Sequence, residues 1–379
     1  MNTMYFDHTK QEFTSHALFA DQFLTSRETI SPHILAHPFL LLCEAGLMVL
    51  FNVPSTVAGF FILTLAYVSL GLVIYAEVLK RLKVLGKWTE LISVGITTAL
   101  MIVAQIPVLL PVDRHIYFGY IGINAYNNST LNLLKPFALV SFLYTLKIFS
   151  ETRPGWKDIL ISAVFMIIGT LAKPNYVICV LPALGLYVLY RLYRREGLQW
   201  RFMIWGIIVP ACATLTWQYA INYGAGSGGI YFAPLLVKYY YSDMLIVKFF
   251  ASILFPLLAT RLYIRMASRD PKMILAWLCF IIGAFYSYFM SETSGGNYTM
   301  GNFDWSAEVS LFILFVVVTL FWVERLLEKK RWEKKDTAAA LAFALHLVSG
   351  GIYYLYSLSV DDYSRLDSLR RLLDVFGKK

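Results

Sequence analysis

The chain has 379 residues, of which 58% are hydrophobic and only 15% are charged, and its formal net charge is +9. Soluble globular domains carry about 25% charged residues. The shortage of charge here runs along the whole chain, which excludes a soluble protein with a single membrane anchor. The basic residues form no face with interleaved aromatic side chains, which argues against a nucleic-acid partner.

The N-terminal part of the chain is polar, and a short apolar stretch follows it. Residues 1–33 lack the apolar core of a signal peptide, and they carry carboxylates and histidines that include Asp7, Glu12 and His16. The stretch 34–51 is apolar but is interrupted by a histidine, a proline and a glutamate. We expect it to lie in the outer membrane interface as an amphipathic helix and not to span.

Ten longer apolar segments come next, and they predict an all-α, polytopic transmembrane bundle of about ten spans. They are 57–79, 91–112, 133–149, 159–172, 176–190, 202–221, 244–264, 273–290, 307–323 and 337–359. The fourth and fifth are shorter than the roughly 20 residues that a span needs. They are either two tight helices separated at Lys173, Pro174 and Asn175 or one broken helix.

The loops between these segments alternate in charge, which predicts the topology. One set holds 20 Lys and Arg residues and the alternate set holds 4. The basic set comprises 80–90, 150–158, 191–201, 261–272 and 324–336. Because cytoplasmic loops are enriched in Lys and Arg, this set is expected in the cytoplasm. The alternation requires that 34–51 does not span. The tail 360–379 falls on the outer side in this topology although it holds five basic residues, and its four aspartates offset much of that charge.

This topology places the N-terminus on the outer side with no span before it. Exporting 33 residues without a leader is unusual. We therefore expect a first transmembrane helix to be missing from the sequence, although a short tail could also translocate unaided. The remaining organisation is a single transmembrane domain with an external N-terminal part, 1–56.

Polar chemistry gathers in the segments expected outside, whereas the cytoplasmic loops hold basic residues and little else. The external candidates are Asp113, Lys135 at the start of the next helix, Lys173 at the helix break, Glu292 and Asn302. A charge in an apolar segment costs about 2.5–3.5 kcal/mol on insertion scales, so Lys173 calls for a function. The alternative for Lys173 is that it has no site function and only extends its ammonium to the outer headgroups. The alternative for Asp113 is an external ion pair with its neighbour Arg114.

Two other patterns carry less chemistry. The run "GAGSGG" at 224–229 lacks the strand and the helix start of a phosphate-binding loop, so we interpret it as a flexible loop. The four cysteines are far apart in apolar segments, which indicates neither a disulfide framework nor a metal cluster. No DxD pair, HExxH or CxxC motif occurs, so no protein-built metal site is expected.

The order of the N-terminal elements resembles the GT-C superfamily of polytopic membrane glycosyltransferases. The resemblance covers about 1–190, and residues 191–379 correspond to the variable part of such proteins. It is carried by "EFTSHALFADQFL" (12–24), "SPHILAHPFLLLCEAGLMVLFNVPS" (31–55), "VAGFFILTLAYVSLGLVIYAEVLKRL" (57–82) and "LAKPNYVICVLPAL" (171–184). The family's first transmembrane helix has no counterpart here, which agrees with the expected truncation.

The resemblance implies a catalytic carboxylate in the first external loop. Glu12, with Phe13 and His16 after it, fits that position, and Asp7 is its rival. Where relatives often show Asp before Pro-Phe, this chain has Lys135, which leaves Asp113 as a substitute. The substrate-binding candidates are Lys173 and Lys135 for a lipid phosphate, together with His16, Asp113, Glu292 and Asn302.

The function that the resemblance implies is sugar transfer from a polyprenyl-phosphate donor on the outer face of a bacterial cell membrane. No cofactor beyond that donor is expected, and the acceptor is a glycan, a lipid or a protein. One alternative is a polymerase or ligase of lipid-linked polysaccharide, although such enzymes favour arginine-rich external loops. Another is a transporter or flippase, which would predict inverted repeats that this sequence lacks.

Overall fold

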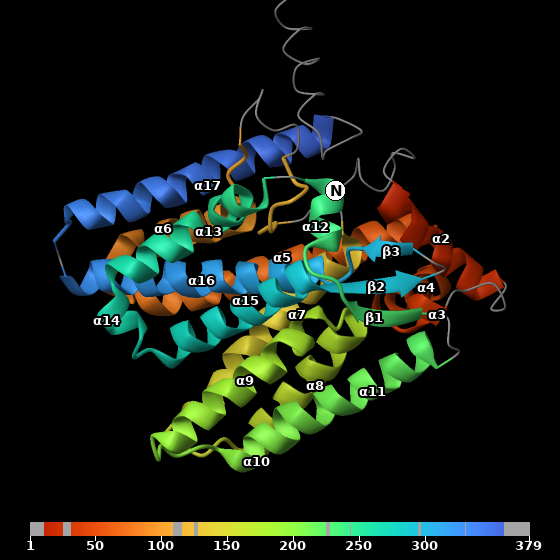
Figure 1. Ribbon diagram of the computed structural model, residues 1–379, viewed down its shortest axis with the longest axis horizontal. Helices are drawn as coiled ribbons and strands as arrows, with labels where there is room; N and C mark the ends of the chain where they lie inside the picture. The colour runs from red at the N-terminus through yellow and green to blue at the C-terminus, as the bar shows by residue number, and fades with distance from the viewer. Residues whose placement is uncertain are drawn as a thin grey trace, which may run out of the picture.

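The protein is described here by a computed structural model that covers residues 11–25, 32–108, 116–124, 128–224, 228–242, 244–294, 297–329 and 331–359 (Figure 1). Within these residues the fold is almost entirely helical, which confirms the all-α prediction. Eight of the described helices are long and apolar enough to cross a membrane, as a multi-pass membrane protein requires.

The eight helices account for most of the predicted segments. They are α5 (Ser55–Leu82), α7 with η3 (Ser129–Phe149), α9 (Asn175–Tyr193), α10 to α11 (Trp200–Tyr223), α13 (Leu245–Leu262), α15 (Pro271–Phe289), α16 (Asp304–Lys329) and α17 (Lys334–Ser359). Shorter helices complete the described chain: α2 (Gln11–Thr25), α3 (Pro32–Leu35), α4 (Phe39–Phe51), η2 (Lys83–Trp88), α6 (Thr89–Ile102), α8 (Trp156–Ala172), α12 (Leu236–Tyr241) and α14 (Ile264–Ala267).

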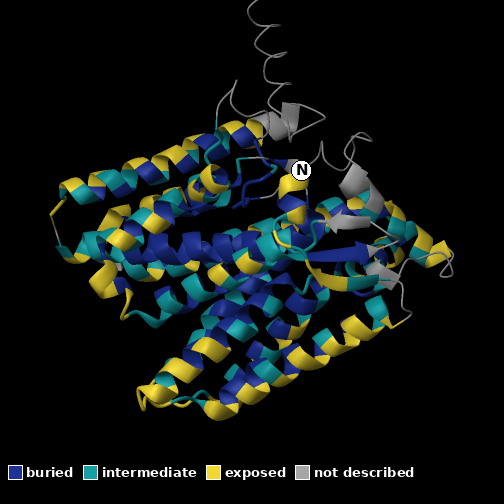
Figure 2. Ribbon diagram, viewed as in Figure 1, coloured by how far each residue is buried: buried dark blue, intermediate teal, exposed yellow. Residues whose placement is uncertain are grey.

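Helix α16 forms the centre of the bundle. The apolar window of this helix is 94% buried, far more than that of the other spanning candidates, and Figure 2 shows α16 as buried along most of its length. Helix α15 packs most extensively against it. Their close approach depends on Gly283, because an added Cβ there would lie 2.4 Å from Ser310 Oγ and 2.6 Å from Ser306 O. Small residues commonly allow such approaches between membrane helices.

Helices α8 and α9 are two separate helices that run in opposite directions. Ser162 Oγ donates a hydrogen bond to Gly206 O (2.9 Å), and further along both helices Gln218 Nε2 donates to Thr170 O (2.7 Å). Helix α8 is therefore parallel to the α10–α11 helix. Because α9 joins them in the chain, it must return in the opposite direction, which selects two tight helices over one broken helix.

The predicted span 91–112 is helical only as far as Ile102. After α6 the described chain continues without helix up to residue 108. Ala104 N donates to a carbonyl of α17 (3.1 Å) and Ile106 N donates to a carbonyl of α13 (3.2 Å). Pro107 has no N–H and disfavours helix in the residue before it. The prediction of a helix throughout this segment was wrong, because neighbouring helices satisfy an extended backbone here.

The stretch 34–51 consists of α3 and α4 with a break between them. Helix α4 has 13 residues, which gives a length of about 20 Å and is shorter than the roughly 30 Å hydrocarbon core. It is not one of the eight helices that could span. Its location in the membrane interface stays a prediction.

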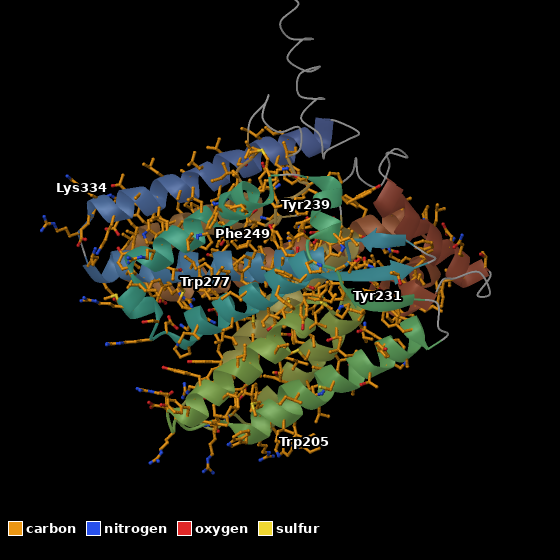
Figure 3. The ribbon with its side chains drawn as sticks, in the orientation of Figure 1. Trp205, Tyr231, Tyr239, Phe249, Trp277 and Lys334 are labelled. Atoms are coloured by element: carbon orange, nitrogen blue, oxygen red, sulfur yellow. The ribbon has the colours of Figure 1, made fainter. Side chains whose placement is uncertain are left out.

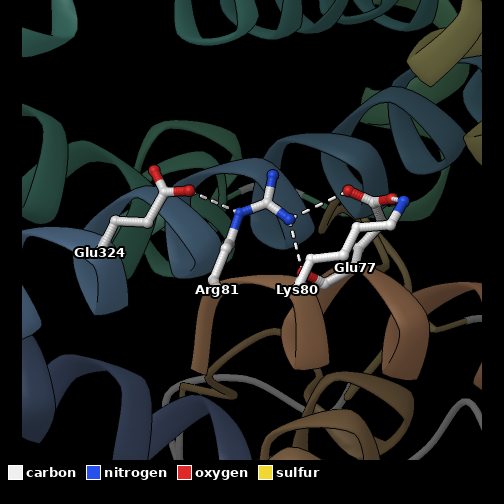
Figure 4. A network of polar contacts seen from close by, with 4 residues as sticks. All are labelled: Glu77, Lys80, Arg81 and Glu324. Atoms are coloured by element: carbon white, nitrogen blue, oxygen red, sulfur yellow. Dashed lines mark hydrogen bonds and ion pairs between the residues drawn. The ribbon is translucent and has the colours of Figure 1, made fainter. Parts of the chain in front are cut away.

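The basic segments gather at one end of the bundle. Arg81 at the end of α5 pairs with Glu324 of α16 (2.7 Å) and with Glu77 of its own helix (2.9 Å; Figure 4). In Figure 1 the α16–α17 turn and α14 lie at the left end, and α10 lies at the bottom. The opposite end holds α2, α3 and an antiparallel sheet of three short strands, β1 (Gly228–Phe232), β2 (Met290–Ser294) and β3 (Asn297–Met300). The sequence analysis treated these strands as loops.

Candidate functional site

A cavity of about 430 Å³ opens at the end of the bundle that carries the sheet. Its walls come from the α3–α4 turn, the α8–α9 turn, α11, the sheet and the start of α16. The lining residues are Ala36, His37, Lys173, Pro174, Asn175, Ile178, Leu215, Thr216, Gln218, Tyr219, Asn222, Tyr223, Ile230, Glu292, Asn302 and Phe303. The cavity thus contains a lysine and a glutamate among amide and aromatic side chains.

Lys173 reaches the cavity because the helix ends directly before it. Pro174 disfavours helical geometry in the residue that precedes it, and Lys173 has extended backbone angles (φ −169°, ψ 131°) at the end of α8. Its Nζ donates hydrogen bonds to Thr130 Oγ1 (3.0 Å) and Asn128 Oδ1 (3.4 Å). It also lies 5.1 Å from the centre of the Trp305 ring. These contacts direct the ammonium toward the start of α7 and the start of α16, and none of the three contacted residues lines the cavity.

Glu292 lies in the central strand of the sheet, and its carboxylate is held by three donors. Strand β2 pairs with both neighbours, so the backbone around Glu292 is fixed on each side. Glu292 Oε1 accepts hydrogen bonds from Asn222 Nδ2 (3.2 Å) and from the Tyr223 hydroxyl, and Oε2 accepts from Asn302 Nδ2 (2.6 Å). Helix α11 and the segment before α16 therefore both orient this carboxylate.

A short chain of hydrogen bonds joins the helix break to the carboxylate. Asn175, two residues after Lys173, donates through Nδ2 to Asn302 O (2.9 Å) and to Ser306 Oγ (2.8 Å). Asn302 in turn donates to Glu292. The position of the Lys-Pro turn and the position of the carboxylate are therefore coupled through one asparagine.

The rest of the cavity wall comes from α11 and the turn between α3 and α4. Gln218 Nε2 donates to Ala36 O (2.8 Å) and lies 3.2 Å from His37 Nδ1, which ties the turn to α11. On the other side of this contact lies an apolar groove of about 720 Å³. The groove residues are Phe23, Leu35, Pro38, Leu41, Leu42, Ile167, Leu171, Ala213, Thr214, Trp217 and Ile221. The cavity and the apolar groove thus share two walls, the α3–α4 turn and α11.

The structure brings together Lys173, Glu292 and Asn302 from the predicted site. His16 is half-buried and contacts the Phe19 ring edge-on at 6.0 Å, and it does not line the cavity. Glu12 lies in α2, but its side chain is outside the described part.

Of the other predicted residues, two lie outside the described part of the chain and one lies away from the cavity. Asp7 and Asp113 lie outside the described residues. Lys135 is buried in the bundle, where its Nζ donates to Asn124 Oδ1 (3.1 Å) and Ile123 O (3.3 Å). The structure therefore does not bring Lys135 to the cavity.

The sequence analysis did not identify several of the cavity residues as site candidates. They are His37, Asn175, Gln218, Asn222 and Tyr223. Asn175 follows directly after the Lys-Pro pair, which was a usable signal. Asn222 and Tyr223 end an apolar helix, where polar residues are expected for solvation alone, so nothing in their local pattern marked them as partners of Glu292.

Three further lysines are buried beside the segment 116–124. Lys135 bonds this segment as described above, Lys238 Nζ donates to Tyr120 O (3.2 Å) and Lys248 Nζ donates to Phe118 O (3.0 Å). Tyr117 of the same segment donates to Glu308 Oε1 of α16 (2.6 Å). Segment 116–124 is thus fixed to the bundle by charged side chains.

The described residues contain no candidate metal site. No group of three or more His, Cys, Asp or Glu side chains among them is arranged to hold a metal ion.

The chain was compared with known proteins. No protein-family model, no curated protein and no solved structure matches it.

Proposed function

We propose that this protein is a membrane glycosyltransferase that transfers a sugar from a polyprenyl-phosphate donor to an acceptor on the non-cytoplasmic face. One observation carries the proposal: Lys173 and Glu292 line the same cavity. That cavity lies at the end of the bundle away from the basic segments, which the positive-inside rule assigns to the cytoplasm.

The donor side of the reaction is assigned to Lys173. The leaving group is a lipid phosphate, and its developing negative charge is stabilised by a nearby cation. A lysine ammonium serves as a point charge for phosphate. The apolar groove beside the cavity offers the lipid chain a hydrophobic surface along α8 and α11. A phosphate at Lys173 therefore has apolar surface within the same region.

The acceptor side is assigned to Glu292. The acceptor hydroxyl oxygen attacks C1 of the sugar, and the bond from C1 to the phosphate oxygen breaks. The electron pair of that bond leaves with the lipid phosphate, and the hydroxyl proton passes to the Glu292 carboxylate. General-base assistance of this kind contributes about 10²–10⁴-fold to rate. Asn222, Tyr223 and Asn302 keep the carboxylate in position for the transfer.

The resemblance to the GT-C superfamily instead assigns the base to Glu12 or Asp7. Both assignments stay predictions, since neither side chain belongs to the described part of the protein. The assignment to Glu292 rests on its place in the same cavity as Lys173. Variants of all three carboxylates distinguish the assignments.

The experiment measures release of lipid phosphate from a labelled polyprenyl-phosphate sugar by the full chain in lipid nanodiscs. We expect Glu292→Gln and Lys173→Gln each to lower turnover by about a hundredfold or more. Glu90→Gln and Lys157→Gln are matched controls, because both side chains are exposed near the basic end, and they retain activity. If Glu12→Gln or Asp7→Asn abolishes release while Glu292→Gln does not, the base belongs to the N-terminal segment.

Two results would contradict the glycosyltransferase itself. Movement of the labelled lipid across the bilayer without cleavage would favour the flippase. Growth of a polymer on a lipid-linked glycan would favour the polymerase or ligase. Normal turnover in both Glu292→Gln and Lys173→Gln would remove this cavity as the active site.

A further inference from the structure

A second hollow, of about 310 Å³, lies at the opposite end of the bundle from the cavity described above. It is formed by the turn from α13 into α14, the end of α16 and the start of α17. Its lining residues are Arg261, Leu262, Tyr263, Ile264, Arg265, Met266, Arg325, Glu328, Lys329 and Lys335. Five of these ten residues carry a positive charge and one carries a negative charge, so the hollow is basic.

Three of the five cations are engaged by carboxylates. Arg325 pairs with Glu328 (2.5 Å), Lys329 pairs with Glu333 (2.7 Å) and Lys335 pairs with the same glutamate (3.1 Å). The first pair lies within α16, and the two pairs that share Glu333 link the end of α16 to the start of α17. They form one wall of the hollow with little net charge.

The other wall carries the excess charge. Arg261 ends α13 and Arg265 lies in α14, and both side chains are exposed. Within the described part of the chain neither arginine makes an ion pair. The planar guanidinium group presents paired N–H donors that match phosphate oxygens in bidentate geometry. Two such groups beside one hollow suit a phosphate group.

Exposed apolar side chains on the same wall decide which kind of phosphate fits. Ile264 is 45% exposed and Met266 is 50% exposed, and they flank Arg265 in the chain. A soluble phosphate would gain nothing from these side chains. A lipid would place its headgroup at the arginines and its acyl chains against the apolar surface.

We propose that this hollow binds the headgroup of an anionic phospholipid on the cytoplasmic face, with Arg261 and Arg265 as its phosphate ligands. The bound headgroup contacts both the α13–α14 turn and the α16–α17 turn, which line the hollow. Basic hollows between transmembrane helices on this face recognise anionic headgroups by the same chemistry. The proposal goes beyond the proposed function, because it concerns a different site and holds whether or not the protein transfers a sugar.

The experiment titrates the purified full chain in detergent with short-chain phosphatidylglycerol, and native mass spectrometry counts the bound lipids. Short-chain phosphatidylcholine controls for lipid without net charge, and inorganic phosphate controls for a soluble ligand. We expect saturable binding of phosphatidylglycerol alone. The double variant Arg261→Gln/Arg265→Gln weakens that binding by about tenfold or more, because it removes both charge-assisted ligands.

A matched variant removes the same charge elsewhere at this end. Arg153→Gln/Arg194→Gln changes two exposed arginines outside the hollow, and it retains the native affinity. Equal weakening in both double variants would reduce the effect to overall charge and overturn the site. Equal binding of phosphatidylcholine, or tight binding of inorganic phosphate, would overturn the anionic lipid as its ligand. Circular dichroism confirms that each variant remains folded.

Discussion

At the scale of single residues, Asn302 connects the two ends of the proposed reaction site. Its side chain donates to Glu292 and its backbone carbonyl accepts from Asn175. We predict that Asn302→Ala lowers turnover about ten- to a hundredfold with little change in KM for the donor, since the carboxylate loses an orienting donor. Gln199→Ala is the control, because that side chain also makes one hydrogen bond but at the basic end (3.0 Å to Ser150 O). Native turnover in Asn302→Ala would contradict a positioning role.

The residue scale also shows what the sequence could predict about the site. Lys173 was recognisable because a charge next to a proline in an apolar run needs a physical reason. Glu292 and Asn302 were recognised only as members of a polar external loop. Their connection to Lys173 depends on Asn175 and on the packing of α9 against α15 and α16. Such long-range contacts leave no spacing signal in one sequence.

At the scale of elements, segment 116–124 is held by buried lysines, among them Lys238, which donates to Tyr120 O (3.2 Å). Lys238 is buried and pairs with Asp304 at the start of α16 (3.2 Å). We predict that Lys238→Met destabilises the folded protein by about 3 kcal/mol, because it leaves the half-buried Asp304 carboxylate without its cation and, among the described residues, with only the hydrogen bond from the Ser287 hydroxyl. Lys80→Met makes the same substitution in an exposed pair with Glu77, and such pairs contribute about 1 kcal/mol or less.

Denaturant unfolding in detergent measures the free energy of unfolding of Lys238→Met and of Lys80→Met. The double variant Lys238→Met/Asp304→Leu should recover part of the loss, because it removes the unpaired charge as well. Equal destabilisation by Lys238→Met and Lys80→Met would show that the buried pair does not hold the element in place.

Elements differed in how well their sequences predicted them. Long apolar runs such as α5, α15 and α16 were recognisable from length and hydropathy alone. The break of α6 at Ile102 was not, because an extended segment inside a membrane bundle is allowed only when neighbouring helices satisfy its backbone. The small sheet was missed because its strands are only four or five residues long and β1 begins with two glycines.

At the scale of the whole molecule, charge and site lie at opposite ends. Lys334 lies at the left end in Figure 3 and Tyr231 lies near the sheet on the right. The proposed function requires that the end with Tyr231 faces away from the cytoplasm, and the distribution of Lys and Arg predicts the same orientation. The two arguments are independent, because one concerns the chemistry of the cavity and the other concerns the loops.

Cysteine labelling in intact cells tests this orientation. Cys212 and Cys43 are first replaced by alanine, because both are at least partly accessible, whereas Cys179 and Cys279 are buried. Tyr231→Cys and Lys334→Cys then each introduce one accessible thiol at opposite ends. We predict that a membrane-impermeant maleimide labels Tyr231→Cys in intact cells and labels Lys334→Cys only after permeabilisation. The reverse pattern would place the cavity on the cytoplasmic side, where a polyprenyl-phosphate donor presented on the outer leaflet could not reach Lys173. That result would contradict the proposed reaction. It would also contradict the assignment of the basic hollow to the cytoplasmic leaflet.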